Sequence, residues 1–165
     1  MSVENDLKII AEQEAALQFD RFDEDMAFAI GRLMREAGKE KGRGIAVGVY
    51  LWDRTLFYGA TAGSTDANRA WVERKTKLVR LMHKSSYRVV LERGDKPRVL
   101  EPSWALETTQ YAIAGGAFPI SVRGLGIVGA VTTSGLSERE DHELGRAAIS
   151  ETLGLDPADF AMPPA

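Results

Sequence analysis

The sequence predicts one α+β domain with three layers, in which a sheet lies between two layers of helices. Helical periodicity marks both ends of the chain, and alternating apolar residues joined by tight turns mark paired strands between them. Strands and helices do not alternate as in parallel strand–helix–strand repeats, so a Rossmann-type fold is not expected. A length of 165 residues and a hydrophobic content of 44% suit a single domain with a full core.

The predicted domain covers residues 1–165 as one unit. Within it, we expect the N-terminal segment 1–22 to carry a helix that packs on a neighbouring subunit. The segment 157–165 ends in Pro-Pro-Ala and is expected to be a tail.

Two helices are predicted in the first quarter of the chain. Residues 3–17 place apolar side chains at helical spacing, which indicates an amphipathic helix. A second helix is predicted over residues 23–40, with Asp23 as a good N-cap. Gly42 and Gly44 then end it.

A hairpin and a third helix are predicted to follow. Residues 45–52 and 56–61 read as two strands, joined by a turn at 53–55. A helix is predicted over residues 66–83. The stretch 84–110 contains two prolines, so a short helix followed by a loop is expected there.

The last third of the chain predicts further strands and a final helix. Strands are expected at residues 118–120 and 127–132, with a turn between them. Ser137 and Glu140 have the spacing of a capping box, which predicts a helix that begins there and ends near Leu153.

Composition excludes several classes of site and partner. The chain has no cysteine, which excludes disulfides, thiolate nucleophiles and sulfur-based zinc or iron–sulfur sites, and which fits a reducing cytoplasm. A net charge of −3 gives no reason to expect nucleic acid or an anionic membrane as a partner. No apolar run approaches the roughly 20 residues that span a bilayer, and the acidic start lacks the features of a signal peptide. We therefore expect a cytoplasmic protein.

Charge is distributed unevenly along the chain. Residues 1–40 hold ten acidic and five basic side chains, and residues 66–101 hold five acidic and ten basic ones. Residues 137–165 are acidic again. These segments either form ordinary solvated faces, or meet one another between subunits, or attract an anionic ligand to the basic segment.

Lys75 occupies a position on the third helix where an apolar side chain is expected. Its helical face is otherwise formed by Trp71, Leu78, Val79 and Met82. A lysine in such a place must snorkel, pair with a carboxylate or bind an anionic ligand. Arg74 is adjacent, and the two cations together could clamp a carboxylate or phosphate. An internal salt bridge is the alternative.

Gly115 and Gly116, followed by Pro119, form a second candidate ligand site. Two glycines leave backbone N–H groups uncovered, and such a turn can hold an anion. The run is not a Walker loop, because no Gly-Lys-Ser/Thr follows. A β-bulge or a close backbone crossing is the alternative interpretation.

His142 is the candidate for chemistry. It lies in the first turn of the final helix, where the helix N-terminus favours neutral imidazole and the neighbouring Asp141 favours the cation. It is a candidate proton carrier, haem ligand or ligand-binding group, with a structural histidine as the alternative. His83 is interpreted as a charge at a helix C-terminus. Two histidines without a nearby carboxylate pair predict no metal site.

The motifs resemble a known family. The runs 71–75, 111–120 and 129–136, together with Asp141 and His142, are similar to a bacterial and fungal family of the haem-degrading-domain superfamily, which includes GlcG-like and HbpS-like proteins. The resemblance covers nearly the whole chain. It implies a profilin-like fold, with a five-stranded antiparallel sheet and helices on both faces. It also implies homo-oligomers and small-molecule binding, with haem as the named candidate.

The resemblance implies a set of ligand-binding positions in this chain, but it assigns no individual role to any of them. These positions are Arg74, Lys75, Gly115, Gly116, Pro119, Ser134, Gly135 and His142. An axial haem ligand would have to come from His83, His142, a methionine or a tyrosine. The leading hypothesis is a small-molecule-binding protein related to haem, with Lys75, Gly116 and His142 in one pocket. The alternatives are an oligomeric structural or interaction protein, and an enzyme in which His142 carries protons.

Overall fold

A five-stranded sheet forms the centre of the computed structural model, which describes residues 2–163. The strands are β1 (Gln18–Phe19), β2 (Ala46–Leu51), β3 (Thr55–Ala60), β4 (Ala117–Val122) and β5 (Gly126–Ser134). Their order across the sheet is β1-β4-β5-β2-β3. The predicted five-stranded sheet is therefore confirmed.

One edge of the sheet departs from the predicted antiparallel arrangement. The pairs β2–β3, β2–β5 and β4–β5 are antiparallel, but β1 pairs with β4 in parallel. β1 is a two-residue strand between two helices, and it reaches the sheet without a hairpin that would reverse the chain. The sheet is mixed for this reason.

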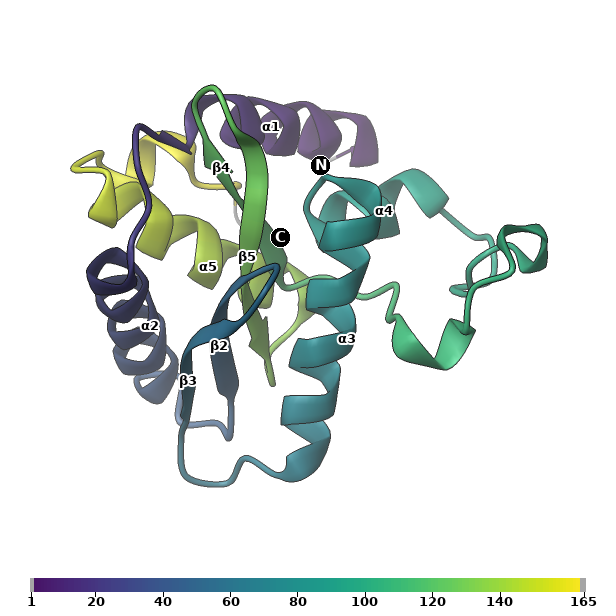
Figure 1. Ribbon diagram of the computed structural model, residues 1–165, viewed down its shortest axis with the longest axis horizontal. Helices are drawn as coiled ribbons and strands as arrows, with labels where there is room; N and C mark the ends of the chain where they lie inside the picture. The colour runs from purple at the N-terminus through teal and green to yellow at the C-terminus, as the bar shows by residue number, and fades with distance from the viewer. Residues whose placement is uncertain (1, 164–165) are drawn as a thin grey trace.

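Helices cover both faces of the sheet, which confirms the three layers (Figure 1). The helices are α1 (Val3–Ala16), α2 (Glu24–Lys39), α3 (Asp66–Met82), α4 (Ser86–Arg93) and α5 (Glu138–Thr152). α2 and α5 pack on one face and α3 on the other, while α1 lies at one end of the sheet beside α4.

The predicted helix starts are present as capping hydrogen bonds. The Asp23 carboxylate accepts from the backbone N–H of Met26 over 3.0 Å at the start of α2. Ser137 and Glu140 form the expected reciprocal capping box at the start of α5. Because each cap satisfies backbone donors that the helix itself leaves unpaired, these residues fix where α2 and α5 begin.

The main hydrophobic core lies between the sheet and the helices α2 and α5. Its largest fully buried side chains include Phe19, Phe118, Ile30, Ile45 and Ile149. A smaller cluster joins α3 to the opposite face, and Trp52 packs against it.

The three tryptophans differ in their surroundings. Trp52 is partly buried, and its indole N–H donates to the carbonyl oxygen of Ile127 over 2.9 Å. Trp71 and Trp104 are 41% and 46% exposed. Trp71 lies on α3, and Trp104 lies in the 3₁₀ turn Pro102–Trp104 of the protruding segment that follows α4.

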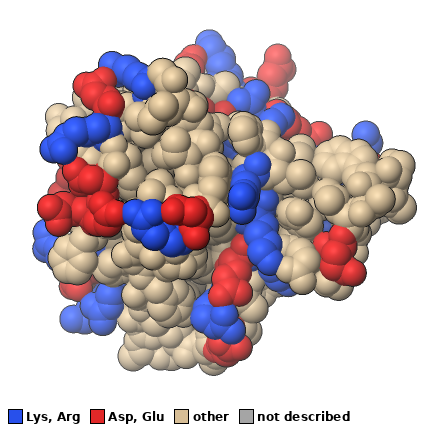
Figure 2. Space-filling model, in the orientation of Figure 1, with Lys and Arg blue, Asp and Glu red and all other residues tan. Residues whose placement is uncertain are grey.

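The acidic N-terminal helix meets basic side chains of its own chain. Glu14 of α1 contacts Arg88 of α4 over 2.6 Å, and Asp6 contacts Arg139 of α5 over 2.8 Å. Figure 2 shows basic side chains over α3 as well, interleaved with acidic ones. Part of the uneven charge is thus balanced within one molecule. Packing of α1 on a neighbouring subunit stays a prediction, as does the single-domain boundary.

The predicted tail contains a short 3₁₀ helix, η3 (Pro157–Phe160), that packs against α5. Residues 164 and 165 of that predicted tail lie outside the described residues. Within residues 2–163, no helix combines the length and the apolar character that crossing a membrane requires.

Candidate functional site

Lys75 lies on the buried face of α3, and its charge is paired inside the protein. The residue is 4% exposed. Its Nζ donates to Asp141 Oδ2 over 2.9 Å and to the carbonyl oxygen of Thr133 over 3.0 Å. Of the three outcomes open to a lysine on an apolar helix face, the structure shows pairing with a carboxylate.

Asp141, in the first turn of α5, is the buried partner in this pair. Its second oxygen, Oδ1, accepts from the backbone N–H of Leu136 over 3.1 Å. Burial raises the pKa of Asp141, and the nearby Lys75 ammonium and backbone N–H groups oppose that rise. The pair joins α3 to the start of α5 at a place that water barely reaches.

Gly116 lets the backbone pass directly beside this ion pair. Its φ of +125° is one that side-chain-bearing residues rarely adopt. A Cβ atom placed there would lie 2.5 Å from the carbonyl oxygen of Thr133 and 2.8 Å from Lys75 Nζ. The glycine is therefore required by a close crossing between the β4 entry, β5 and the lysine head.

The neighbouring Gly115 turn holds a carboxylate that belongs to the protein. The Gly115 N–H donates to Glu138 Oε1 over 2.9 Å. Arg98 donates to both oxygens of the same carboxylate. Pro119 lies buried in β4, opposite Ala130 of β5.

Ser134 and Gly135 shape the exit from β5. The Ser134 carbonyl oxygen accepts from the Asn68 side chain over 3.3 Å. Gly135 has a φ of +139°, and a Cβ there would lie 2.5 Å from the carbonyl oxygen of Gly44. Both residues thus have contacts that direct the chain into α5.

His142 is fully buried and points away from Lys75, toward α1. Its Nε2 lies 2.9 Å from the side-chain oxygen of Gln13. The Gln13 nitrogen donates to Phe160 O and to Glu143, so its oxygen is the acceptor and the imidazole proton is on Nε2. The Nδ1 atom has no hydrogen-bond partner among residues 2–163. The ring centroids of Tyr87 and Phe118 lie 5.5 and 5.4 Å from that of the imidazole.

The environment keeps His142 neutral. Burial lowers its pKa to about 3, and the positive charges of Arg146 and Arg139 act in the same direction. A proton carrier works best when its pKa is near the working pH. The role of His142 as a proton carrier stays a prediction, which this low pKa does not favour.

The predicted residues fall into separate places. Lys75, Gly116 and Asp141 converge, whereas His142 lies on another side of α5 and contacts Gln13 of α1 instead. Arg74 is also apart: its guanidinium donates to the carbonyl oxygen of Tyr111 over 3.3 Å.

A hollow of about 800 Å³ runs along the outer side of α5. It is larger than the hollow of about 230 Å³ beside the β2–β3 hairpin. Its lining includes Tyr87 and Met162, and its charged side chains are balanced, with three basic ones (Lys41, Arg139 and Arg146) and three acidic ones (Glu138, Glu140 and Glu143). We refer to it as the α5 hollow. Its size lies within the range of small-molecule sites.

Comparison with known proteins identifies the family. A family model described as "Haem degrading protein HbpS-like" matches residues 22–150. The chain belongs to this HbpS-like family. The predicted relationship is therefore confirmed.

Close relatives of this HbpS-like chain are found in Brucella. A UPF0303 protein of Brucella anthropi is 49% identical over 154 residues, which cover 93% of this chain and 91% of that protein. A UPF0303 protein of Brucella melitensis biotype 2 is 47% identical over 156 residues, covering 94% and 92%.

Solved structures share the fold. The Ybr137w protein aligns with a TM-score of 0.81 at 27% identity, over 90% of this chain and 89% of that one. HbpS aligns with a TM-score of 0.66 at 19% identity, over 83% and 93%. The PduOC:Heme complex aligns with a TM-score of 0.66 at 12% identity, over 78% and 93%. At these lower identities the likeness concerns the fold alone.

The sequence analysis did not identify the residues of this HbpS-like chain that bind its candidate residues Lys75 and His142. Asp141 was noted as a neighbour of His142, yet it pairs with Lys75 across 66 positions of sequence. Gln13 was not considered, although it binds His142 from α1. The available signal for Gln13 was its place three residues after Ile10, on the same buried face of α1.

Proposed function

We propose that this HbpS-like chain binds a small, flat, anionic molecule in the α5 hollow, with haem as the first candidate. The observation that carries the proposal is a hollow of about 800 Å³ whose wall offers Tyr87 and Met162 as potential iron ligands and Lys41 as a cation for an acidic group. Small-molecule sites typically join an apolar cavity to a few well-placed polar groups. The family description names haem degradation, and a protein of the same fold is described in a complex with haem.

The residues of the α5 hollow fit haem in kind. Tyr87 and Met162 both line it, and a tyrosine oxygen or a methionine sulfur can serve as an axial ligand. His142 is fully buried with its Nε2 bound to Gln13, and His83 is exposed at the end of α3. The histidines are therefore poorer ligands here than the tyrosine or the methionine.

Lys41 is the best-placed cation for a propionate. Its ammonium lies 3.6 Å from Glu140, and both side chains are nearly half exposed. Such surface pairs contribute little, so the lysine can turn to a ligand at small cost. Arg146, by contrast, is held by Glu143 and by the carbonyl oxygen of Pro157. Bound haem would supply iron-centred chemistry, while this wall would bind and orient it.

Titration with hemin, followed at the Soret band, tests the proposal. We expect saturable binding that is weakened or spectrally shifted in Tyr87→Phe or Met162→Leu. Tyr58→Phe is the matched control, because Tyr58 is an exposed tyrosine of β3 that is distant from this lining. Non-saturable binding, or the same spectrum and affinity in all variants, would rule out haem in the α5 hollow.

Self-association is a second candidate role, favoured by exposed apolar side chains. Phe28, Trp104 and Leu125 are 59%, 46% and 75% exposed. These side chains lie on α2, in the 3₁₀ turn Pro102–Trp104 and in the β4–β5 turn, so each is a separate candidate contact rather than part of one patch. We propose a homo-oligomer because the family resemblance implies one, and sedimentation velocity should then show one discrete species larger than 18.1 kDa.

A further inference from the structure

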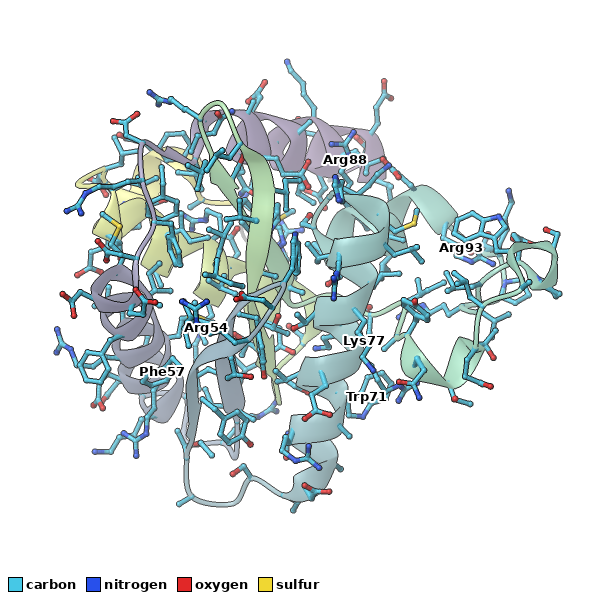
Figure 3. All side chains as sticks on the ribbon, viewed as in Figure 1. Arg54, Phe57, Trp71, Lys77, Arg88 and Arg93 are labelled. Atoms are coloured by element: carbon cyan, nitrogen blue, oxygen red, sulfur yellow. The ribbon has the colours of Figure 1, made fainter. Side chains whose placement is uncertain are left out.

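A second, smaller hollow lies between α3 and the protruding segment that follows α4. Its volume is about 220 Å³. Its wall includes two arginines, Arg74 and Arg98, and apolar side chains of Val99, Leu100 and Ile113. Figure 3 shows Trp71 and Lys77 on the side of α3 that faces this segment. We refer to this hollow of about 220 Å³ as the Arg74 hollow.

Arg74 brings an uncompensated charge to this hollow. Among residues 2–163 no carboxylate lies within 4.0 Å of its guanidinium, although most other arginines in that range have such a partner. Its protein contacts are one hydrogen bond to the Tyr111 carbonyl oxygen, at 3.3 Å, and the ring of Trp71, at 4.8 Å from the guanidinium carbon. The charge therefore lacks a counter-ion.

The Nε atom of Arg74 is also buried, and it has no hydrogen-bond acceptor in the part of the chain that the structure describes. A buried N–H that has lost water and found no partner is costly, so such atoms point to a ligand that completes them. Trp71 stacks on the guanidinium and limits its orientations, which prepares the planar fork for a planar acceptor.

Arg98 adds no net charge to the Arg74 hollow. Its two Nη atoms donate to the two oxygens of Glu138 over 2.8 and 3.1 Å. This bidentate pair neutralises Arg98, so the hollow keeps the positive charge of Arg74 alone. One negative charge on the ligand would match it.

We propose that the Arg74 hollow binds a small carboxylate with a short apolar body. The guanidinium fork matches the two oxygens of a carboxylate, and Val99, Leu100 and Ile113 offer an apolar wall for a few carbon atoms. The volume lies below the range of drug-sized sites, which limits the ligand to a handful of carbons. This site is separate from the α5 hollow and shares no lining residue with it.

Calorimetric titration with sodium butyrate tests this site, with butyramide as the uncharged isostere. We expect saturable butyrate binding, no butyramide binding, and a loss of about tenfold or more in affinity in Arg74→Gln, because the variant removes the cation of this hollow that has no carboxylate partner among residues 2–163. Arg80→Gln is the matched control, since Arg80 lies on the same helix outside this hollow. A change in Trp71 emission on binding, absent in Trp71→Phe, locates the ligand.

Several results would overturn the proposal. Equal binding of butyrate and butyramide, or equal butyrate affinity in Arg74→Gln and in the unaltered chain, removes the role of Arg74. Tighter binding of inorganic phosphate than of butyrate removes the apolar carboxylate class. If circular dichroism shows that Arg74→Gln is misfolded, Arg74→Lys decides: it keeps the charge and loses the fork, so unchanged affinity contradicts bidentate recognition. Hemin binding should be the same in all these variants.

Discussion

Lys75 is held by two oxygen acceptors, Asp141 and the Thr133 carbonyl, in a place that is closed to water. Lys75→Met should lower the free energy of unfolding by about 3–5 kcal/mol, because it leaves the Asp141 carboxylate buried without its counter-ion. Urea denaturation measures this. Lys77→Met, an exposed position on the same helix, should change it by about 0.5 kcal/mol or less. A small loss of stability in Lys75→Met would mean that water reaches the Asp141 carboxylate in the folded chain.

A double variant separates the charge from the packing. Lys75→Met combined with Asp141→Leu removes both charges, so it should recover much of the stability that Lys75→Met loses. If the double variant is as unstable as the sum of the two single variants, then the ion pair is not the cause.

His142 makes stability depend on pH in the acidic range. Its pKa is about 3 in the folded chain and near the ordinary 6.5 when unfolded. Between these values the unfolded chain binds the extra proton, so stability rises with pH and is lost as pH falls. From pH 6 to 4 the loss due to His142 should approach about 1.4 kcal/mol per pH unit.

Urea denaturation at several pH values measures this loss against a variant that cannot titrate. His142→Gln should flatten the slope between pH 6 and 4, whatever it does to absolute stability. His83→Gln should keep the slope, because His83 is exposed. An unchanged slope in His142→Gln would assign the acid sensitivity to other groups.

At the scale of elements, the strong periodic patterns predict the fold well. The helices begin at the predicted caps, for example at Asp23 and Ser137, because capping is local in sequence. β1 escapes prediction because two residues, Gln18 and Phe19, cannot show an alternating pattern. The partner strand β4 is about a hundred positions away in sequence, so the residues around β1 predict neither this strand nor its parallel direction.

The candidate site is less predictable than the elements that carry it. The burial of Lys75 follows from helical spacing, but its partner Asp141 follows only from how α3 and α5 pack on the sheet. The sequence shows a glycine at position 116, but only the structure shows why, because the chain crosses the Thr133 backbone closely there. The α5 hollow lies between distant segments, so no spacing in the sequence announces it.

At the scale of the whole molecule, Gln13 ties three elements together. From α1 it accepts from His142 of α5, and it donates to the Phe160 carbonyl of η3 over 2.7 Å. The side chain is 1% exposed, so each of these hydrogen bonds lacks a water substitute. α1 and η3 should therefore open together when this link is removed.

Hydrogen exchange on Gln13→Leu tests this coupling. The variant leaves His142 Nε2 and the Phe160 carbonyl without a partner, at a cost of about 1–3 kcal/mol for each buried group. Amides of α1 and η3 should exchange faster together, while those of β2 and β5 in the centre of the sheet change least. Gln18→Leu is the control, because among residues 2–163 the Gln18 side chain donates only to the nearby carbonyl oxygen of Ala15. Faster exchange in α1 alone would show that the helix and the 3₁₀ turn are independent, and that Gln13 serves only to cover the imidazole.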